Sequence, residues 1–224
     1  MTYGVLIVTQ TLTDKLSAFL RMHLTRDTLE DLEKNIISRY GDVDSYIKNN
    51  FTHIPKQRLR QQMRRYNIDE ALCMSGGIVC NTYPRGENYI VIDLDNVKVS
   101  HVEVAHNKRI RDAAHRKLLS QLNTILEPIQ IDLFDADKKT NFDSKLHAVI
   151  VVAHPAASES SQSTPNDIFI TIPFSNWRGF HLFVPISEFI LGYMNEEHHQ
   201  PVFDMAWPTL LVEIKDEEAK QSNE

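Results

Sequence analysis

Residues 88–117 read NYIVIDLDNVKVSHVEVAHNKRIRDAAHRK, and this stretch joins two strand patterns directly to the pattern of a basic helix. Apolar residues dominate 88–94, and valines alternate with polar residues over 97–105, as is typical of β-strands. The Asp95–Asn96 pair between them favours a tight turn. The stretch therefore predicts a β-hairpin followed by a helix over 108–125, with Asn107 as its N-cap.

Four polar residues of this hairpin form the candidate catalytic group. Side chains two positions apart share one face of a strand, so we expect Asp93 and Asp95 on one face of the first strand. His101 and Glu103 share a face of the second strand for the same reason. Carboxylate oxygens suit Mg²⁺ or Mn²⁺, so the sequence predicts Asp93 and Glu103 as metal ligands. The alternative is a hairpin whose polar face only meets solvent.

Two cationic helices flank the hairpin. Residues 55–66 predict a helix with a narrow apolar stripe opposite a wide cationic face, and the helix after the hairpin is also cationic. Cations in a first helical turn oppose the helix dipole, which indicates an external anion. The predicted nucleic-acid contacts are Arg58, Arg60, Arg64, Arg65, Lys108, Arg109, Arg111 and Arg116. The alternatives are solvated surface charges and neutralisation by another part of the chain.

The charge is distributed unevenly along the 224 residues, whose net charge is −6. Residues 53–117 carry twelve lysines and arginines against seven acidic residues, whereas residues 118–224 carry six against sixteen. A basic middle favours a phosphate-rich partner such as DNA or RNA. An acidic half that folds back against a basic middle would give the same counts.

The remaining pattern predicts an α+β fold: a mixed, mostly antiparallel sheet flanked by helices, with a helical N-terminal layer. Helices are expected over 12–24, from Asp27 to Gly41, from Asp42, and after Pro185. Strands are expected over 3–9, 71–82, 129–134, 146–153, 168–174, 179–184 and 209–214, with a mobile loop over 155–167. We expect one compact domain over 1–215, with a weak internal boundary near Asp69, and a disordered acidic tail over 216–224.

Composition and motifs exclude several classes of protein. No segment approaches the roughly 18 apolar residues that a membrane span requires, so we expect a cytoplasmic protein without a membrane anchor. Cys73 and Cys80 are the only cysteines and form no paired motif, which argues against a disulfide framework. The sequence holds no HExxH, GxGxxG, Walker, GxSxG or CxxC motif, so no known reaction is indicated.

The expected order of elements over 55–134 is one helix, three strands, one helix and one strand. This order resembles the core of the PD-(D/E)xK nuclease superfamily. The resemblance implies an acidic residue on the second strand, here Asp93 or Asp95, and an acidic-x-Lys motif on the third, which together hold a divalent metal beside the scissile phosphate. Residues 101–105 read HVEVA, so Glu103 is present and the lysine is absent.

Two functional hypotheses follow. The first is a nucleic-acid-interacting protein whose basic helices contact phosphates, with a nuclease-like, metal-dependent hairpin. The second is a non-enzymatic regulatory or host-defence module, whose acidic C-terminal half binds a protein partner. The aromatic and basic residues 177–181, WRGFH, are a further candidate for stacking on bases or a peptide. The sequence leaves open whether the protein is an enzyme.

Overall fold

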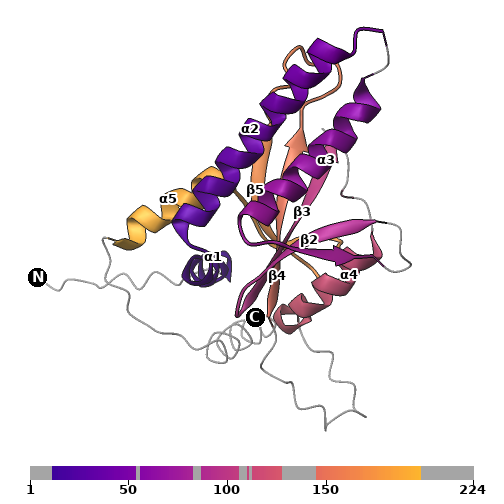
Figure 1. Cartoon of the computed structure of the whole chain (residues 1–224). Coiled ribbons are helices and arrows are strands. Elements are labelled where there is room, and N and C mark those ends of the chain that lie inside the picture. The colour runs from indigo at the N-terminus through magenta and orange to yellow at the C-terminus, as the bar shows by residue number, and fades with distance from the viewer. Residues whose placement is uncertain are drawn as a thin grey trace, which may run out of the picture.

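The computed structural model describes residues 12–53, 56–82, 87–105, 110, 113–127 and 145–197. Its elements in chain order are α1 (Leu12–His23), α2 (Arg26–Asn50), α3 (Gln57–Met74), β1 (Ile78–Asn81), β2 (Asn88–Asp93), β3 (Val97–Ala105), α4 (Ala114–Ser120), the 3-10 helix η1 (Gln121–Leu126), β4 (Leu146–His154), β5 (Asp167–Pro173), β6 (Phe180–Pro185) and α5 (Ile186–Glu197). Three helices therefore precede a six-stranded sheet, as Figure 1 shows.

The sheet follows the chain in the order β1-β2-β3-β4-β5-β6. Only β3 and β4 run parallel, and every other neighbouring pair is antiparallel. The parallel pair is joined through α4, because a crossover needs a long connection. The predicted α+β fold with a mixed, mostly antiparallel sheet is confirmed. The hairpin strands over 88–105 and the strands around 146–154, 167–173 and 180–185 are also as predicted.

The prediction of two helices that are separated at Gly41 is wrong, because α2 runs through this position. It is one helix of 25 residues, and its cap is Thr25, whose side-chain oxygen accepts from the Thr28 N–H, rather than Asp27. The buried residues Ile36, Tyr40, Val43, Asp44 and Ile47 continue one stripe across Gly41. Burial of this continuous face outweighs the cost of about 1 kcal/mol that a glycine imposes inside a helix.

The prediction of a strand that begins at Ala71 is wrong, because Ala71 belongs to α3. The helix extends to Met74, because Ile68, Ala71 and Leu72 are buried at helical spacing. The chain then turns through Gly76, whose φ of 90° is a conformation that glycine adopts readily. The strand that follows, β1, is therefore only four residues long.

The helix predicted over 108–125 is also shorter than expected. Ile110 and Ala113 lie outside any helix, and α4 begins at Ala114 without a side-chain cap. It continues as η1, from which the buried Asn123 binds two strand ends. Its amide nitrogen donates to the carbonyls of His147 and Pro173, and its amide oxygen accepts from the His147 N–H. Of the predicted phosphate contacts in this segment, Arg116 lies on α4, and Lys108, Arg109 and Arg111 are outside the described residues.

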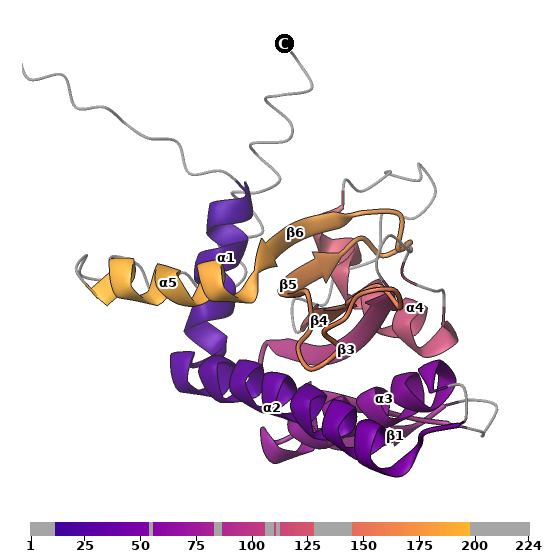
Figure 2. The same ribbon diagram turned by 90° about the horizontal axis from the view of Figure 1, so that it is seen from above.

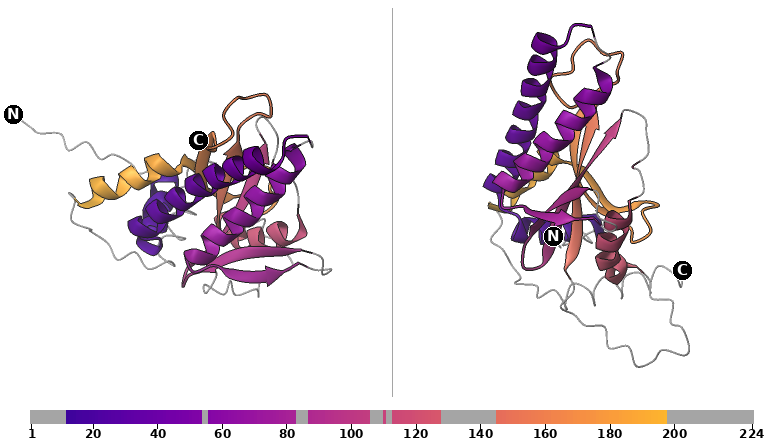
Figure 3. Two further views of the ribbon diagram at one scale, coloured as in Figure 1. Left: turned by 45° about the horizontal axis from the view of Figure 1, so that its top comes forward. Right: turned by 45° about the vertical axis from the view of Figure 1, so that its right-hand side comes forward.

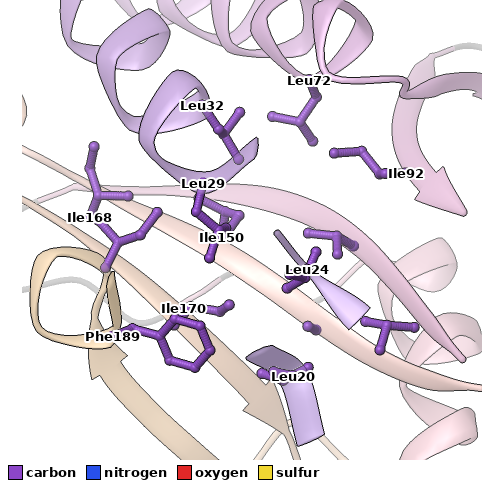
Figure 4. Packing of buried hydrophobic residues seen from close by; sticks show 14 of the residues in the cluster. Leu20, Leu24, Leu29, Leu32, Leu72, Ile92, Ile150, Ile168, Ile170 and Phe189 are labelled. Atoms are coloured by element: carbon purple, nitrogen blue, oxygen red, sulfur yellow. The ribbon is translucent and has the colours of Figure 1, made fainter. Parts of the chain in front are cut away.

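The main core lies between the sheet and the helices α1, α2, α3 and α5. Figure 4 shows Leu20, Leu29 and Leu72 from the helices packed towards Ile150 and Ile170 of the sheet. Helix α4 covers the opposite face, where Ser120 contacts His147. In Figure 2, α2 and α3 lie side by side against one side of the strands, and α4 lies near the end of β3. Only part of the second face is covered in this way.

The β1–β2 hairpin diverges from β3, and this divergence positions the candidate site. Ile92 pairs with Val99 and Asp93 with Lys98, and no later residue of β3 pairs with β2. Figure 3 shows the hairpin turned away from the direction of β3 and β4. The edge of β3 from Ser100 onwards is therefore open on the side facing β2.

Several predictions concern residues that the structure does not describe. These are the strands over 3–9, 129–134 and 209–214 and the tail over 216–224. Within the described ranges, no helix is both long and apolar enough to cross a membrane. The loop that was predicted to be mobile, 155–167, is described, and its Gln162 is buried against α3.

Candidate functional site

The candidate site is a cleft of about 490 Å³ at the point where β2 and β3 diverge. One wall is α3, the other is α4, and the floor is the open edge of β3. Both helices and the strand come from the segment that the sequence marks as basic. The cleft brings together residues that lie far apart in the chain, from Arg58 to His154.

His101 of β3 and Asp69 of α3 form a hydrogen-bonded pair in the cleft. The His101 Nε2–H donates to the Asp69 carboxylate over 2.6 Å, and the His101 side chain is only 8% exposed. This bond fixes the orientation of the ring. The other ring nitrogen, Nδ1, is buried and has no hydrogen-bond partner among the described residues. A buried polar atom without a partner is costly in a native structure, and it often marks a site where a ligand binds.

Glu103 lies two residues further along the same face of β3. Its Oε2 accepts from His154 Nε2 over 2.9 Å, and the hydroxyl of Tyr40 donates to His154 Nδ1 over 2.5 Å. Burial raises the pKa of Tyr40, with the charge of Glu103 adding to the effect, so its hydroxyl keeps the proton that it donates. Glu103 Oε1 is buried and has no partner in the described ranges. Within the part of the chain that the structure describes, His101 Nδ1 and Glu103 Oε1 are thus both buried in the cleft without a hydrogen-bond partner.

Three arginines line the cleft from its two sides. Arg58 and Arg65 come from α3, and Arg116 comes from α4. Arg58 is exposed and forms no ion pair with any described residue. Arg65 binds the carboxylate of Glu87 over 2.7 Å and the carbonyl of Asn88 over 3.0 Å. Burial lowers the pKa of Arg116 below its usual range, and the charge of Arg65 contributes to this change.

His115 forms part of the same wall as a neutral ring. It stacks on Tyr89, with 4.5 Å between the ring centroids and 18° between their planes. Burial, together with the charges of Arg116 and Arg65, lowers its pKa to about 4. The ring is therefore uncharged at neutral pH, so it adds a flat apolar surface to the cleft.

The other arginines predicted to contact nucleic acid lie elsewhere. Arg60 binds the buried carboxylate of Asp44 over 3.2 Å. Arg64 is 3% exposed and donates to Gln162, and its guanidinium lies 4.4 Å from the centre of the Tyr40 ring. Both arginines therefore bind groups of the same chain, as the alternative of neutralisation by another part of the chain predicts. Lys108, Arg109 and Arg111 lie outside the described residues.

The structure does not bring the predicted metal ligands together. Asp93 lies at the turn end of the hairpin, where it pairs with Lys98 and Lys145. The hydrogen bond from Lys145 lowers the pKa of Asp93, and Asp95 is exposed nearby. Glu103 lies roughly 17 Å further along β3 than the partner of Asp93, at 3.3 Å per residue. Among the described residues, no three His, Cys, Asp or Glu side chains are grouped so as to hold a metal ion.

Sequence reasoning missed the partners of the two cleft residues that it identified. Asp69 was considered only as a weak boundary, yet it lies inside α3 and orients His101. Tyr40 carries no functional signal in the sequence, and His154 stands out only because it precedes a proline. Helical spacing does place Asp69 four residues after Arg65, on the same face of α3. That spacing is the one signal in the sequence that links it to the cleft.

Comparison with known proteins gives no match to a family model, to a curated protein or to a solved structure.

Proposed function

We propose that this chain binds nucleic acid and that the cleft between α3 and α4 receives the phosphate backbone. The observation that carries the proposal is the convergence of Arg58 and Arg65 from one helix with Arg116 from another. Arginine presents its N–H donors in a fixed fork that matches the oxygens of a phosphate. The proposal retains three of the predicted contacts as phosphate ligands and assigns structural roles to Arg60 and Arg64.

The order of elements around the cleft supports the same proposal. Helix α3, strands β1 to β3, helix α4 and strand β4 follow the succession for which the sequence resembles PD-(D/E)xK nucleases. Glu103, the acidic residue of the third strand in that resemblance, lines the cleft. Ala105 stands where the lysine of the family pattern would be. We place the binding in the cytoplasm, and the free thiols of Cys73 and Cys80 support a reducing compartment.

Charge reversal tests this proposal. We expect Arg58→Glu and Arg116→Glu each to weaken binding of labelled duplex DNA, single-stranded DNA or RNA by about tenfold or more at low salt, because each loses a phosphate contact and gains a repulsive charge. Gel mobility shifts measure the affinities. Lys34→Glu is the matched control, since Lys34 is an exposed helical cation outside the cleft. Unchanged affinity in both cleft variants, or an equal loss in the control, would contradict the proposal.

Cleavage of a phosphodiester is a second candidate function, and it is favoured by His101 Nδ1 and Glu103 Oε1, two buried atoms that no described residue hydrogen-bonds. Water would be the nucleophile, and Glu103 would take its proton as the water oxygen bonds to phosphorus. The bond from phosphorus to the leaving oxygen breaks, and protonated His101 gives that oxygen its Nδ1 proton. Asp69 would stabilise the charged ring from the Nε2 side. The products are a phosphate monoester and an alcohol.

Glu103→Gln separates cleavage from binding. The variant keeps the shape of the side chain and an oxygen that can accept from His154, but it cannot take a proton. Loss of an acid or base typically costs about 10²- to 10⁴-fold in rate, so we expect cleavage to fall by that factor and affinity to stay within about twofold. Labelled oligonucleotides are incubated with Mg²⁺, with Mn²⁺ and with EDTA. Equal cleavage by the variant and the wild type would exclude Glu103 as the base.

A further inference from the structure

A second concave surface lies on the opposite face of the sheet from the main core. This aromatic groove has a volume of about 990 Å³ and is bounded by α4 and η1, by the ends of β3 to β6, and by the turn 174–179. Its apolar floor includes Val104 and Val151. These valines belong to a small hydrophobic cluster that is separate from the main core.

Aromatic rings form one side of the aromatic groove. Phe183 is 46% exposed, and its ring centroid lies 4.5 Å from that of Phe169 and 5.0 Å from that of Phe180. Trp177 packs on the valine cluster at the other side. An exposed aromatic cluster in a concave surface is unfavourable in water unless it has a partner, so it points to a binding site.

The turn that carries Trp177 is held in a fixed conformation. Trp177 has a φ of 59°, a left-handed conformation that is costly for a bulky side chain. The carboxylate of Glu127 accepts from both the Ser175 N–H and the Ser175 hydroxyl, over 2.6 and 2.8 Å. The Trp177 N–H donates to the Phe174 carbonyl, and the Phe174 N–H donates to the Gly179 carbonyl. These bonds position the indole before any ligand arrives.

The charge of the aromatic groove indicates what kind of partner fits it. Lys117 and Arg178 line it, and no carboxylate does so among the described residues. The whole chain has a net charge of −6, whereas the charged residues that line the groove in the described ranges are both cations. Aromatic rings beside cations complement a ligand that has flat apolar rings and negative charge. A nucleotide has both features.

The aromatic groove adjoins the cleft of the proposed function near the end of β3. Val104 of β3 lines both surfaces. The adjacent residues Arg116 and Lys117 of α4 line one surface each, Arg116 the cleft and Lys117 the groove. One extended strand of nucleic acid can therefore contact both surfaces.

We propose that the aromatic groove stacks the bases of single-stranded nucleic acid whose phosphates contact the cleft between α3 and α4. This inference rests on the proposed function and adds a preference for single strands, because the bases of a duplex are already stacked in pairs. Phe183 and Trp177 supply the stacking faces, and Arg178 contacts a phosphate beside them. The groove thus defines the substrate class of the binding site.

Phe183→Ala tests the inference, because Phe183 is exposed and its removal leaves the core intact. Fluorescence anisotropy of the full chain compares a labelled oligothymidylate of roughly 12 nucleotides with a duplex of the same length. We expect the variant to bind the single strand about five- to a hundredfold more weakly and the duplex as the wild type does. Phe183→Tyr keeps the ring and should bind like the wild type. Leu191→Ala is the control, since Leu191 is 59% exposed on α5, outside the groove.

A second readout does not depend on the alanine variant. In a Trp207→Phe background, Trp177 is the only tryptophan, and the single strand should quench its fluorescence. Unchanged single-strand affinity in Phe183→Ala, or equal losses for single strand and duplex, would overturn the inference. If the wild type binds both nucleic acids and Phe183→Ala changes neither affinity, the groove inference alone fails. If the wild type binds neither nucleic acid, the proposed function fails with it.

Discussion

Arg64 and Arg58 lie on the same helix and have opposite surroundings. Arg64 is 3% exposed, lies over the ring of Tyr40 and donates to Gln162, whereas Arg58 is exposed at the mouth of the cleft. Both residues read as surface cations in the sequence, because a helical pattern cannot show that the loop 155–166 covers one side of α3. The contrast separates a structural arginine from one that is available to a ligand.

Arg64→Met should destabilise the fold, and Arg58→Met should not. Methionine fills the space above Tyr40 but leaves the Gln162 acceptors without a donor, so we expect a loss of about 2–4 kcal/mol in the free energy of unfolding. The exposed Arg58 should change it by less than about 0.5 kcal/mol. Urea unfolding followed by circular dichroism measures both values. Similar values for the two variants would mean that the contacts of Arg64 contribute little.

The sequence predicts which strand residues face the cleft but not the residues that orient them. Strand alternation predicts that His101 and Glu103 share a face, and both line one cleft. The partners that orient them, Asp69 and His154, come from a helix and a distant strand. Local patterns cannot predict such pairs, because tertiary packing alone brings them together. The separation of Asp93 from Glu103 has a different origin, since it follows from the register of the hairpin: Asp93 pairs with Lys98, five residues before Glu103.

At the scale of elements, strands were predicted more accurately than helix ends. The alternation over 97–105 and the apolar run over 146–154 are strong signals, since they reflect which faces are buried. The errors occur at glycines and at the start of α4. Gly41 reads as a helix end, but the residues on both sides of it are buried in one stripe. Such helix boundaries are set by burial in the tertiary structure and cannot be predicted from the helix propensities of single residues.

Two glycine-to-alanine variants should therefore change stability in opposite directions. At Gly41 an added Cβ would meet only the Ser163 carbonyl oxygen at 3.9 Å, so alanine should stabilise α2 by about 0.5–1 kcal/mol. At Gly77 it would lie 2.7 Å from the Leu72 carbonyl oxygen and 2.5 Å from Ile90, so alanine should destabilise the α3–β1 junction by about 1–3 kcal/mol. Thermal unfolding measures both changes. A stabilising Gly77→Ala would contradict the close packing of this junction.

At the scale of the whole molecule, two surfaces meet at the end of β3. The cleft is lined by arginines and by His101 and Glu103, and the aromatic groove is lined by aromatic rings and cations. Val104 joins them, and α4 separates them. The charge counts predict a basic region over 53–117 but not which of its arginines line the cleft. Binding of phosphate therefore depends on a few cations rather than on the net charge of the chain, which is negative.

The most direct measurement of the central claim is the salt dependence of nucleic-acid binding. Each lost phosphate contact lowers the slope of log affinity against log salt by about 0.7 for single strands and 0.9 for duplex DNA. We predict that Arg58→Gln/Arg116→Gln binds more weakly than the wild type at low salt, with a slope that is smaller by about 1.4–1.8. An affinity and a slope equal to those of the wild type would contradict phosphate binding in the cleft.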